Sequence, residues 1–193
     1  MISRREALRR LTLLAAGAMA TRAIGADRMT LPAPSHAGSD KFGRRLPERK
    51  LGRTGLNVCM LTCGGSHVGR PSEAEAQRII ETAMEVGIRT FETAQLYQNG
   101  GSEERYGKFL TPKYREQILL FTKTMATDAA TAEKHLDGSL RRMKVDYLDL
   151  WQMHDLRSPE EFDRRRSGGV LDFMVKAKAA GKVRHIGFTG HAT

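Results

Sequence analysis

The chain has 193 residues, of which 40% are hydrophobic and 28% are charged, a composition typical of a globular protein rather than a disordered or membrane-embedded one. Its net charge of +10 suggests a nucleic-acid-binding protein at first sight, but residues 1–26 hold five arginines against one glutamate. The remaining charge is spread out and lacks the interleaved aromatic residues of strand-stacking platforms, so no nucleic-acid partner is expected.

Residues 1–26 are predicted to be a signal peptide. A basic start, MISRREALRR, precedes the apolar stretch LTLLAAGAMA, which is too short to span a bilayer, so no stable membrane span is predicted. The segment SRREALR resembles the twin-arginine export motif, with Ala7 where that motif prefers Phe. The resemblance implies a bacterial protein, periplasmic or otherwise exported, that the twin-arginine export machinery carries in folded form. A basic amphipathic helix is the alternative.

Residues 27–47 are predicted to be a linker, because they are rich in Pro, Gly, Ser and charge, and residues 48–193 are predicted to form one domain. LGRTGLNV (51–58) places turn residues between short apolar pieces and predicts a hairpin. VCMLTCGG (58–65) is a nearly continuous apolar run that ends in glycines, which predicts a buried parallel strand.

The two cysteines, Cys59 and Cys63, are expected to be buried free thiols. In an extended strand their Cα atoms would be about 13 Å apart, whereas a disulfide requires less than about 7 Å. Their spacing also fits no zinc or iron–sulfur pattern, so no metal site is predicted.

Strands and helices then alternate. Four further apolar strands are expected at 88–94, 117–124, 145–156 and 183–190. Helices are expected between them, two of them with capping boxes at Ser72 and Ser158, and the last interrupted by two glycines at 168–169. This alternation predicts an α/β fold with a parallel sheet, either a doubly wound sheet or a (β/α)8 barrel. No G-x-G-x-x-G follows the first strand, which disfavours a doubly wound dinucleotide-binding domain.

Ionisable residues stand at the carboxyl ends of three successive strands. These residues are Glu92, Lys123 and His154, each 31 positions from the next, and Tyr97 lies in the loop that follows Glu92. One strand–helix unit therefore separates each pair, which predicts that all three lie on neighbouring strands at one level. Barrel active sites are built at this end of the strands.

The same segments resemble the aldo-keto reductase family. FETAQLYQNGGSEERYG (91–107) resembles that family's tyrosine signature, FTKT (121–124) and LWQMHD (150–155) resemble its lysine and histidine segments, and RHIGFTGH (184–191) resembles its fifth-strand segment. The resemblance implies a parallel (β/α)8 barrel and NADPH-dependent reduction of a small-molecule carbonyl substrate.

By this resemblance each candidate residue has a role. Tyr97 would donate the proton, Lys123 would favour its phenolate form, and His154 would hydrogen-bond the carbonyl oxygen. Glu92 would pair with Lys123, although the family has Asp there. The extra methylene would move the carboxylate by roughly 1.5 Å, and a misplacement of about 1 Å can lower a rate on the order of a hundredfold.

The resemblance also implies cofactor contacts, assigned to two short pairs of residues: Gly65, Ser66, Thr189 and Gly190. A complete barrel has eight strands and about 250 residues, whereas residues 48–193 provide only strands one to five. By the resemblance, strands six to eight carry the remaining cofactor-binding groups. We therefore expect a barrel cut short after five strands, with weak or no activity. The alternatives are a non-catalytic binding or structural barrel and a fragment of a larger reductase.

Overall fold

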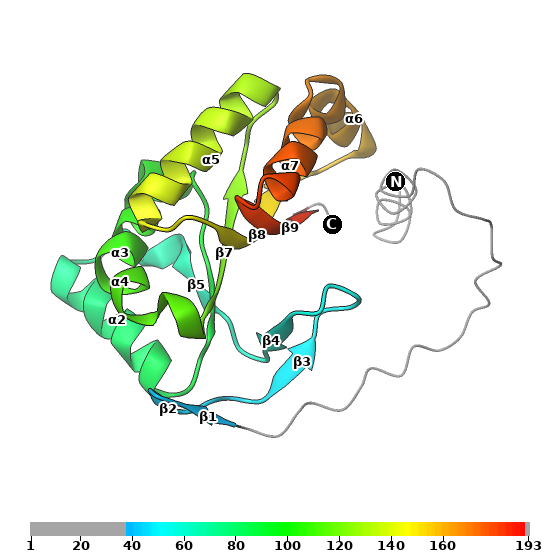
Figure 1. Ribbon diagram of the computed structural model, residues 1–193. Helices are drawn as coiled ribbons and strands as arrows, with labels where there is room; N and C mark the ends of the chain where they lie inside the picture. The colour runs from blue at the N-terminus through cyan, green and yellow to red at the C-terminus, as the bar shows by residue number, and fades with distance from the viewer. Residues whose placement is uncertain (1–37, 192–193) are drawn as a thin grey trace.

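The computed structural model describes residues 38–191 (Figure 1). The predicted signal peptide, 1–26, and residues 27–37 of the predicted linker lie outside the described residues. No helix within 38–191 is long and apolar enough to cross a membrane.

Residues 38–47, which the sequence assigned to the linker, are part of the folded unit. Strands β1 (Ser39–Asp40) and β2 (Gly43–Arg44) pair with each other in antiparallel fashion. The guanidinium of Arg89, a residue only 2% exposed, donates a hydrogen bond to Oδ2 of Asp40 at 2.7 Å and so ties this hairpin to the domain.

The next hairpin is confirmed, but the long strand predicted after it is wrong. Strands β3 (Glu48–Lys50) and β4 (Asn57–Cys59) pair antiparallel, and the chain then turns so that Met60 is 58% exposed. Its backbone N–H bonds the carbonyl of Pro47 at 2.9 Å rather than a neighbouring parallel strand. Only β5 (Cys63–Gly64) joins the parallel sheet. The start of the run 58–65 pairs with β3 instead, and only its end pairs with the next parallel strand.

The main sheet has five parallel strands in the order β5-β6-β7-β8-β9, which is also their order in the chain. All four strands predicted after the first are confirmed, with these bounds: β6 (Thr90–Glu92), β7 (Leu119–Thr124), β8 (Leu148–Met153) and β9 (Val183–Phe188). In register, Glu92 lies beside Phe121 and Lys123 beside Gln152. The predicted α/β class with a parallel sheet is therefore confirmed.

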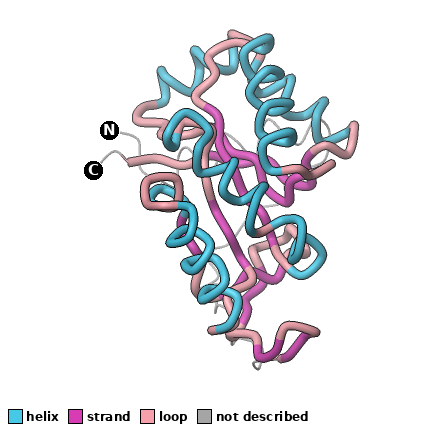
Figure 2. Tube along the Cα trace, turned by 90° about the vertical axis from the view of Figure 1, so that its left-hand side faces the viewer, coloured by secondary structure: helices cyan, strands magenta, loops and turns pink. Residues whose placement is uncertain are grey.

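Helices cover one face of this sheet and lie in front of the strands in Figure 2. Their bounds are α2 (Glu73–Glu85), α3 (Gly101–Phe109), α4 (Thr111–Tyr114), α5 (Ala129–Met143), α6 (Pro159–Ser167) and α7 (Val170–Ala179), with 3-10 turns η1 (Gly65–His67), η2 (Tyr97–Gly100) and η3 (Arg115–Gln117). Ser72 and Ser158 cap α2 and α6 as predicted, by accepting the backbone N–H three residues later. Asp128 caps α5 in the same way, which the sequence did not indicate.

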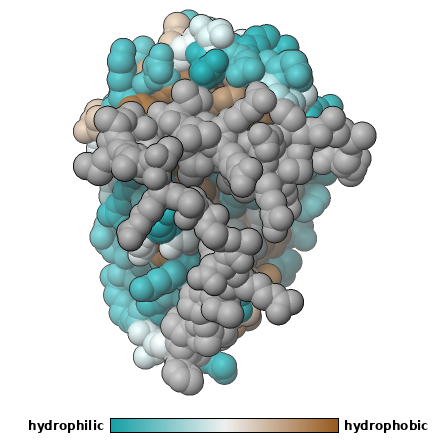
Figure 3. Space-filling model, turned by 90° about the vertical axis from the view of Figure 1, so that its right-hand side faces the viewer, coloured by the Kyte–Doolittle hydropathy of each residue, from teal (hydrophilic) through white to brown (hydrophobic). Residues whose placement is uncertain are grey.

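The core lies between the sheet and the helices. The ring of Phe91 on β6 packs edge-on against Tyr106 of α3 at 5.9 Å, and that of Trp151 on β8 packs against Phe173 of α7 at 6.1 Å. Because successive side chains of a strand point to opposite faces, Glu92 and Lys123 lie on the face away from the helices. Seen from the side opposite to Figure 2, the space-filling view shows hydrophobic residues reaching the surface among hydrophilic ones (Figure 3).

Candidate functional site

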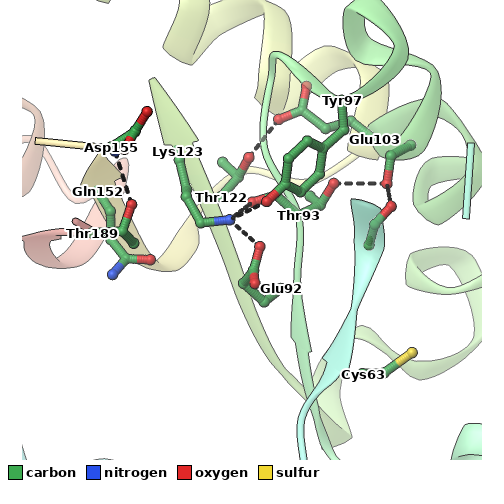
Figure 4. A network of polar contacts seen from close by, with 12 residues as sticks. Cys63, Glu92, Thr93, Tyr97, Glu103, Thr122, Lys123, Gln152, Asp155 and Thr189 are labelled. Atoms are coloured by element: carbon green, nitrogen blue, oxygen red, sulfur yellow. Dashed lines mark hydrogen bonds and ion pairs between the residues drawn. The ribbon is translucent and has the colours of Figure 1, made fainter. Parts of the chain in front are cut away.

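Glu92, Tyr97 and Lys123 converge on the face of the sheet away from the helices (Figure 4). Lys123 Nζ donates hydrogen bonds to Tyr97 Oη at 3.3 Å and to the carbonyl oxygen of Thr93 at 2.9 Å, and it forms an ion pair with Glu92. The parallel pairing of β6 with β7 brings these residues together although the lysine and the glutamate are 31 positions apart. Glutamate in place of aspartate therefore keeps the pairing with the lysine.

The ammonium of Lys123 is fully partnered. The residue is 4% exposed, and a buried ammonium is unfavourable unless an anion and other acceptors satisfy it. Its three protons match its three acceptors on Glu92, Thr93 and Tyr97. Because the phenol oxygen accepts from the ammonium, its own proton remains free for a third group.

The loop that carries Tyr97 has an unusual backbone. Gln98, Asn99 and Gly100 are consecutive left-handed residues, with φ of 50°, 53° and 95°. Such conformations are unfavourable for residues other than glycine and persist where the surroundings impose them. The side chain of Gln98 donates to the carbonyl oxygen of Ser66 at 3.0 Å, which attaches the loop to the turn after β5.

His154 follows β8 and completes the site. Its ring packs edge-on against that of Tyr97, with centroids 5.7 Å apart, and its backbone N–H donates to the carbonyl of Thr124 at 2.8 Å. Arg165, on α6, donates to the carbonyl oxygen of His154 at 3.0 Å. Burial, and secondarily the positive charge of Lys123, lowers the pKa of His154 to about 4. The imidazole is therefore neutral near pH 7 and can donate a hydrogen bond without carrying a charge.

We expect this histidine to make the domain less stable in mild acid. Because its pKa is about 4 when folded and about 6.5 when unfolded, only the unfolded chain takes up the proton between those values. The free energy of unfolding should therefore fall by about 1–3 kcal/mol between pH 7 and pH 4 on account of His154.

Urea unfolding of wild type and His154→Gln at pH 8, 7, 5.5 and 4.5 measures this contribution. The variant should lose less stability than wild type below pH 7, while the change between pH 8 and pH 7 should be the same for both. Parallel curves down to pH 4.5 would contradict the buried, neutral imidazole.

The residues predicted to contact the cofactor form two separate pairs. Gly65 and Ser66 lie under the Tyr97 loop, and Gly65 accepts a hydrogen bond from the Ser102 hydroxyl at 2.7 Å. Thr189 and Gly190 follow β9, where the Thr189 hydroxyl accepts from the backbone N–H of Asp155 at 3.0 Å. Four interstrand spacings separate β5 from β9, roughly 15–20 Å along the sheet. The two pairs therefore flank the site and do not meet.

Several buried polar residues behind the site were not assigned from the sequence. Glu103 and Thr122 are fully buried and hydrogen-bonded to each other at 2.6 Å, and Arg165, which holds the carbonyl of His154, is 1% exposed. Glu103 lies within the segment 91–107 that resembles the family's tyrosine signature. Nothing in the sequence between Glu103 and Thr122 indicates that the two residues are in contact. Among residues 38–191 no group of three or more His, Cys, Asp or Glu could hold a metal ion.

Comparison with known proteins matches residues 60–193 to the model of the Aldo/keto reductase family. The chain is 33% identical to the 6-dehydroglucose reductase of Novosphingobium aromaticivorans, over 72% of this chain and 50% of that protein. It is 33% identical to L-galactose dehydrogenase of Arabidopsis thaliana, over 74% and 48%. Among solved structures, the holo form of an aldo-keto reductase from Bacillus halodurans superposes with a TM-score of 0.66 at 28% identity, covering 74% of this chain and 50% of that one. The chain thus spans about half the length of these relatives.

Proposed function

Because this chain belongs to the aldo/keto reductase family, we propose that its site performs NADPH-dependent reduction of a carbonyl compound, with Tyr97 as the proton donor. The observation that carries the proposal is the contact of one buried ammonium, that of Lys123, with both Tyr97 Oη and Glu92. A cation in that position stabilises the negative charge that develops on the phenol oxygen as its proton leaves.

Two buried polar atoms after β8 have no hydrogen-bond partner among the described residues: Nδ1 of His154, whose ring packs against Tyr97, and Oδ1 of Asp155. A protonated nitrogen of the neutral imidazole can donate to a carbonyl oxygen, whereas the carboxylate of Asp155 only accepts and suits a donor such as an amide N–H. When bound, NADPH would supply the hydride that reduces the carbonyl carbon. Tyr97 would then transfer its proton to the carbonyl oxygen, and the neutral His154 would orient that oxygen by a hydrogen bond.

We further propose that the 193-residue chain alone binds NADPH weakly and turns over slowly. Among the described strands, β5 and β9 each pair on one side only. Two or three charge-assisted phosphate contacts of roughly 1.5–3 kcal/mol each would be missing from these five strands. Their loss weakens binding by about two to six orders of magnitude. The same open edges favour the second candidate, a binding or structural role that requires further strands.

The test uses the purified chain and two measurements. NADPH binding should be followed by the emission of the dinucleotide itself, because Trp151 is fully buried on the helix-facing side of the sheet and reports poorly on the site. Reduction should be measured by product formation with protein in excess over a panel of aldehydes and sugars, since two relatives are named for sugar substrates.

We expect binding weaker than micromolar and slow formation of alcohol. The absence of product with every carbonyl, in protein shown to be folded, would reject the catalytic proposal in favour of the second candidate. Micromolar binding with steady reduction would instead show that these five strands suffice, and would reject the weak-binding proposal alone.

We also propose export, on the basis of the arginine pair before the apolar stretch in residues 1–26. Fractionation of cells that express wild type and the Arg4→Lys, Arg5→Lys double variant tests it. Wild type should be shortened and exported, and the variant should be retained at full length. Retention of both in unprocessed form would contradict the twin-arginine assignment.

A further inference from the structure

Arg142 lies behind the Tyr97 loop, and its guanidinium group forms an ion pair with the buried carboxylate of Glu103. Its Nε and Nη2 atoms, on α5, donate to Oε2 of Glu103 at 2.8 and 2.6 Å. Glu103 is fully buried, and its other oxygen accepts from the hydroxyl of Thr122 at 2.6 Å. Thr122 precedes Lys123 in β7. A chain of charge-assisted hydrogen bonds, all of them to the Glu103 carboxylate, thus runs from α5 to the residue beside the lysine.

Two glycines leave the space that the Arg142 side chain occupies. A Cβ on Gly100, in the Tyr97 loop, would lie 2.6 Å from Arg142 Nε, and one on Gly138 would lie 2.9 Å from Nη1. Gly100 also has a φ of 95°, which favours glycine on its own account. The guanidinium stem therefore packs directly on the backbone of the loop, with no side chain between them.

This contact falls where the loop is most strained. Gly100 follows Gln98 and Asn99, whose left-handed backbone requires support from the surroundings. The turn after β5 holds Gln98 through the carbonyl of Ser66. Arg142 packs against Gly100 and is therefore a second support for the same loop.

We propose that Arg142 is a positioning residue that sets the geometry of Tyr97 and Lys123, by supporting the tyrosine loop directly and β7 through Glu103. The proposal rests on the proposed function for the roles of these two residues. Glu103 has no other cation within the contacts of the described chain. Without Arg142 its buried charge would be uncompensated, so Glu103 would move toward water and release Thr122.

The test measures the geometry itself and needs neither NADPH nor a substrate. The full chain, with ring-labelled tyrosine and histidine, should show an NOE between the Tyr97 and His154 rings, because these pack edge-on at 5.7 Å between centroids. In Arg142→Met the intensity should fall by about threefold or more, since a poorly supported site loosens by about 1 Å. Arg142→Lys should restore it in part, because lysine keeps the charge but not the planar fork.

Arg89→Met is the matched control, since Arg89 is another arginine paired with a carboxylate, Asp40, and lies just before β6 in the same strand–loop unit as Tyr97. It should lower the unfolding midpoint while leaving the Tyr97–His154 NOE unchanged. Thr122→Val provides a milder variant that removes only the hydroxyl bonded to Glu103 and should weaken the NOE without unfolding the chain.

An unchanged NOE in Arg142→Met and Thr122→Val would overturn the proposal, as would equal losses in Arg89→Met, because either result makes Arg142 a general stabiliser. A failure of the proposed function alone would give a different result. The NOE would then change in the variants as expected, but neither wild type nor any variant would reduce a carbonyl.

Discussion

Replacement of Tyr97 by phenylalanine should lower the rate of carbonyl reduction by about 10²- to 10⁴-fold, the usual contribution of a positioned general acid. The change removes the phenol oxygen and its proton and keeps the ring that packs on His154. Lys123 retains Glu92 and the carbonyl of Thr93 as partners, so the free energy of unfolding should change by no more than about 1 kcal/mol. Product formed with protein in excess measures the rate, and urea unfolding measures the stability.

Tyr147→Phe is the matched control for this prediction. The Tyr147 ring lies between the guanidinium groups of Arg115 and Arg184, at 4.0 and 4.2 Å from their central carbons. Removal of its hydroxyl should leave the reduction rate unchanged. A Tyr97→Phe variant that reduces carbonyls as fast as Tyr147→Phe would mean that another group supplies the proton.

Gly107→Ala should lower the free energy of unfolding by about 3 kcal/mol or more, at the upper end of overpacking effects. A Cβ at this position of α3 would lie 1.8 Å from the backbone carbonyl oxygen of Arg142, in α5. Alanine favours a helix over glycine by about 1 kcal/mol, but this gain is too small to offset a clash with backbone that cannot rotate away. The helices would have to separate, which also disturbs the hydrogen bond from Thr111 to the carbonyl of Met143.

Urea unfolding of the variant measures this loss, with Gly64→Ala as the control. Gly64 has an ordinary negative φ of −81°, and a Cβ there would meet nothing within 4 Å, so its substitution should change stability by less than about 0.5 kcal/mol. A Gly107→Ala variant as stable as wild type would show that α3 and α5 adjust without cost.

Much of the fold was predictable because local patterns and global pairing agree. Strands β6 to β9 are apolar runs that alternate with helices, and sequential parallel pairing then places Glu92, Lys123 and His154 at the ends of neighbouring strands. The equal spacing of these three residues in the sequence therefore predicted that they lie close together. Tyr97 was located by resemblance, since a tyrosine in a loop carries no periodic signal of its own.

The remaining features depend on contacts between distant segments. The pairing of Arg89 with Asp40, 49 positions away, makes residues 38–47 part of the domain, and composition alone indicates a linker there. The break after Cys59 follows from a hydrogen bond of Met60 to Pro47 that no apolar pattern reveals. Similarly, Arg142 looks like an ordinary charged residue of an exposed helix face until the glycines around it are seen in space.

The agreement between strand order in the sheet and strand order in the chain has a consequence for biosynthesis. Within residues 38–191, each strand of the main sheet pairs only with its neighbours in the chain, so none of these strands has to wait for a distant partner before it can be added. During translation, at about 5–20 residues per second, β6 and β7 can pair while β8 is still within the ribosome. The ion pair of Glu92 with Lys123 would then be in place before His154 emerges, so the nascent chain acquires its site in a defined temporal order.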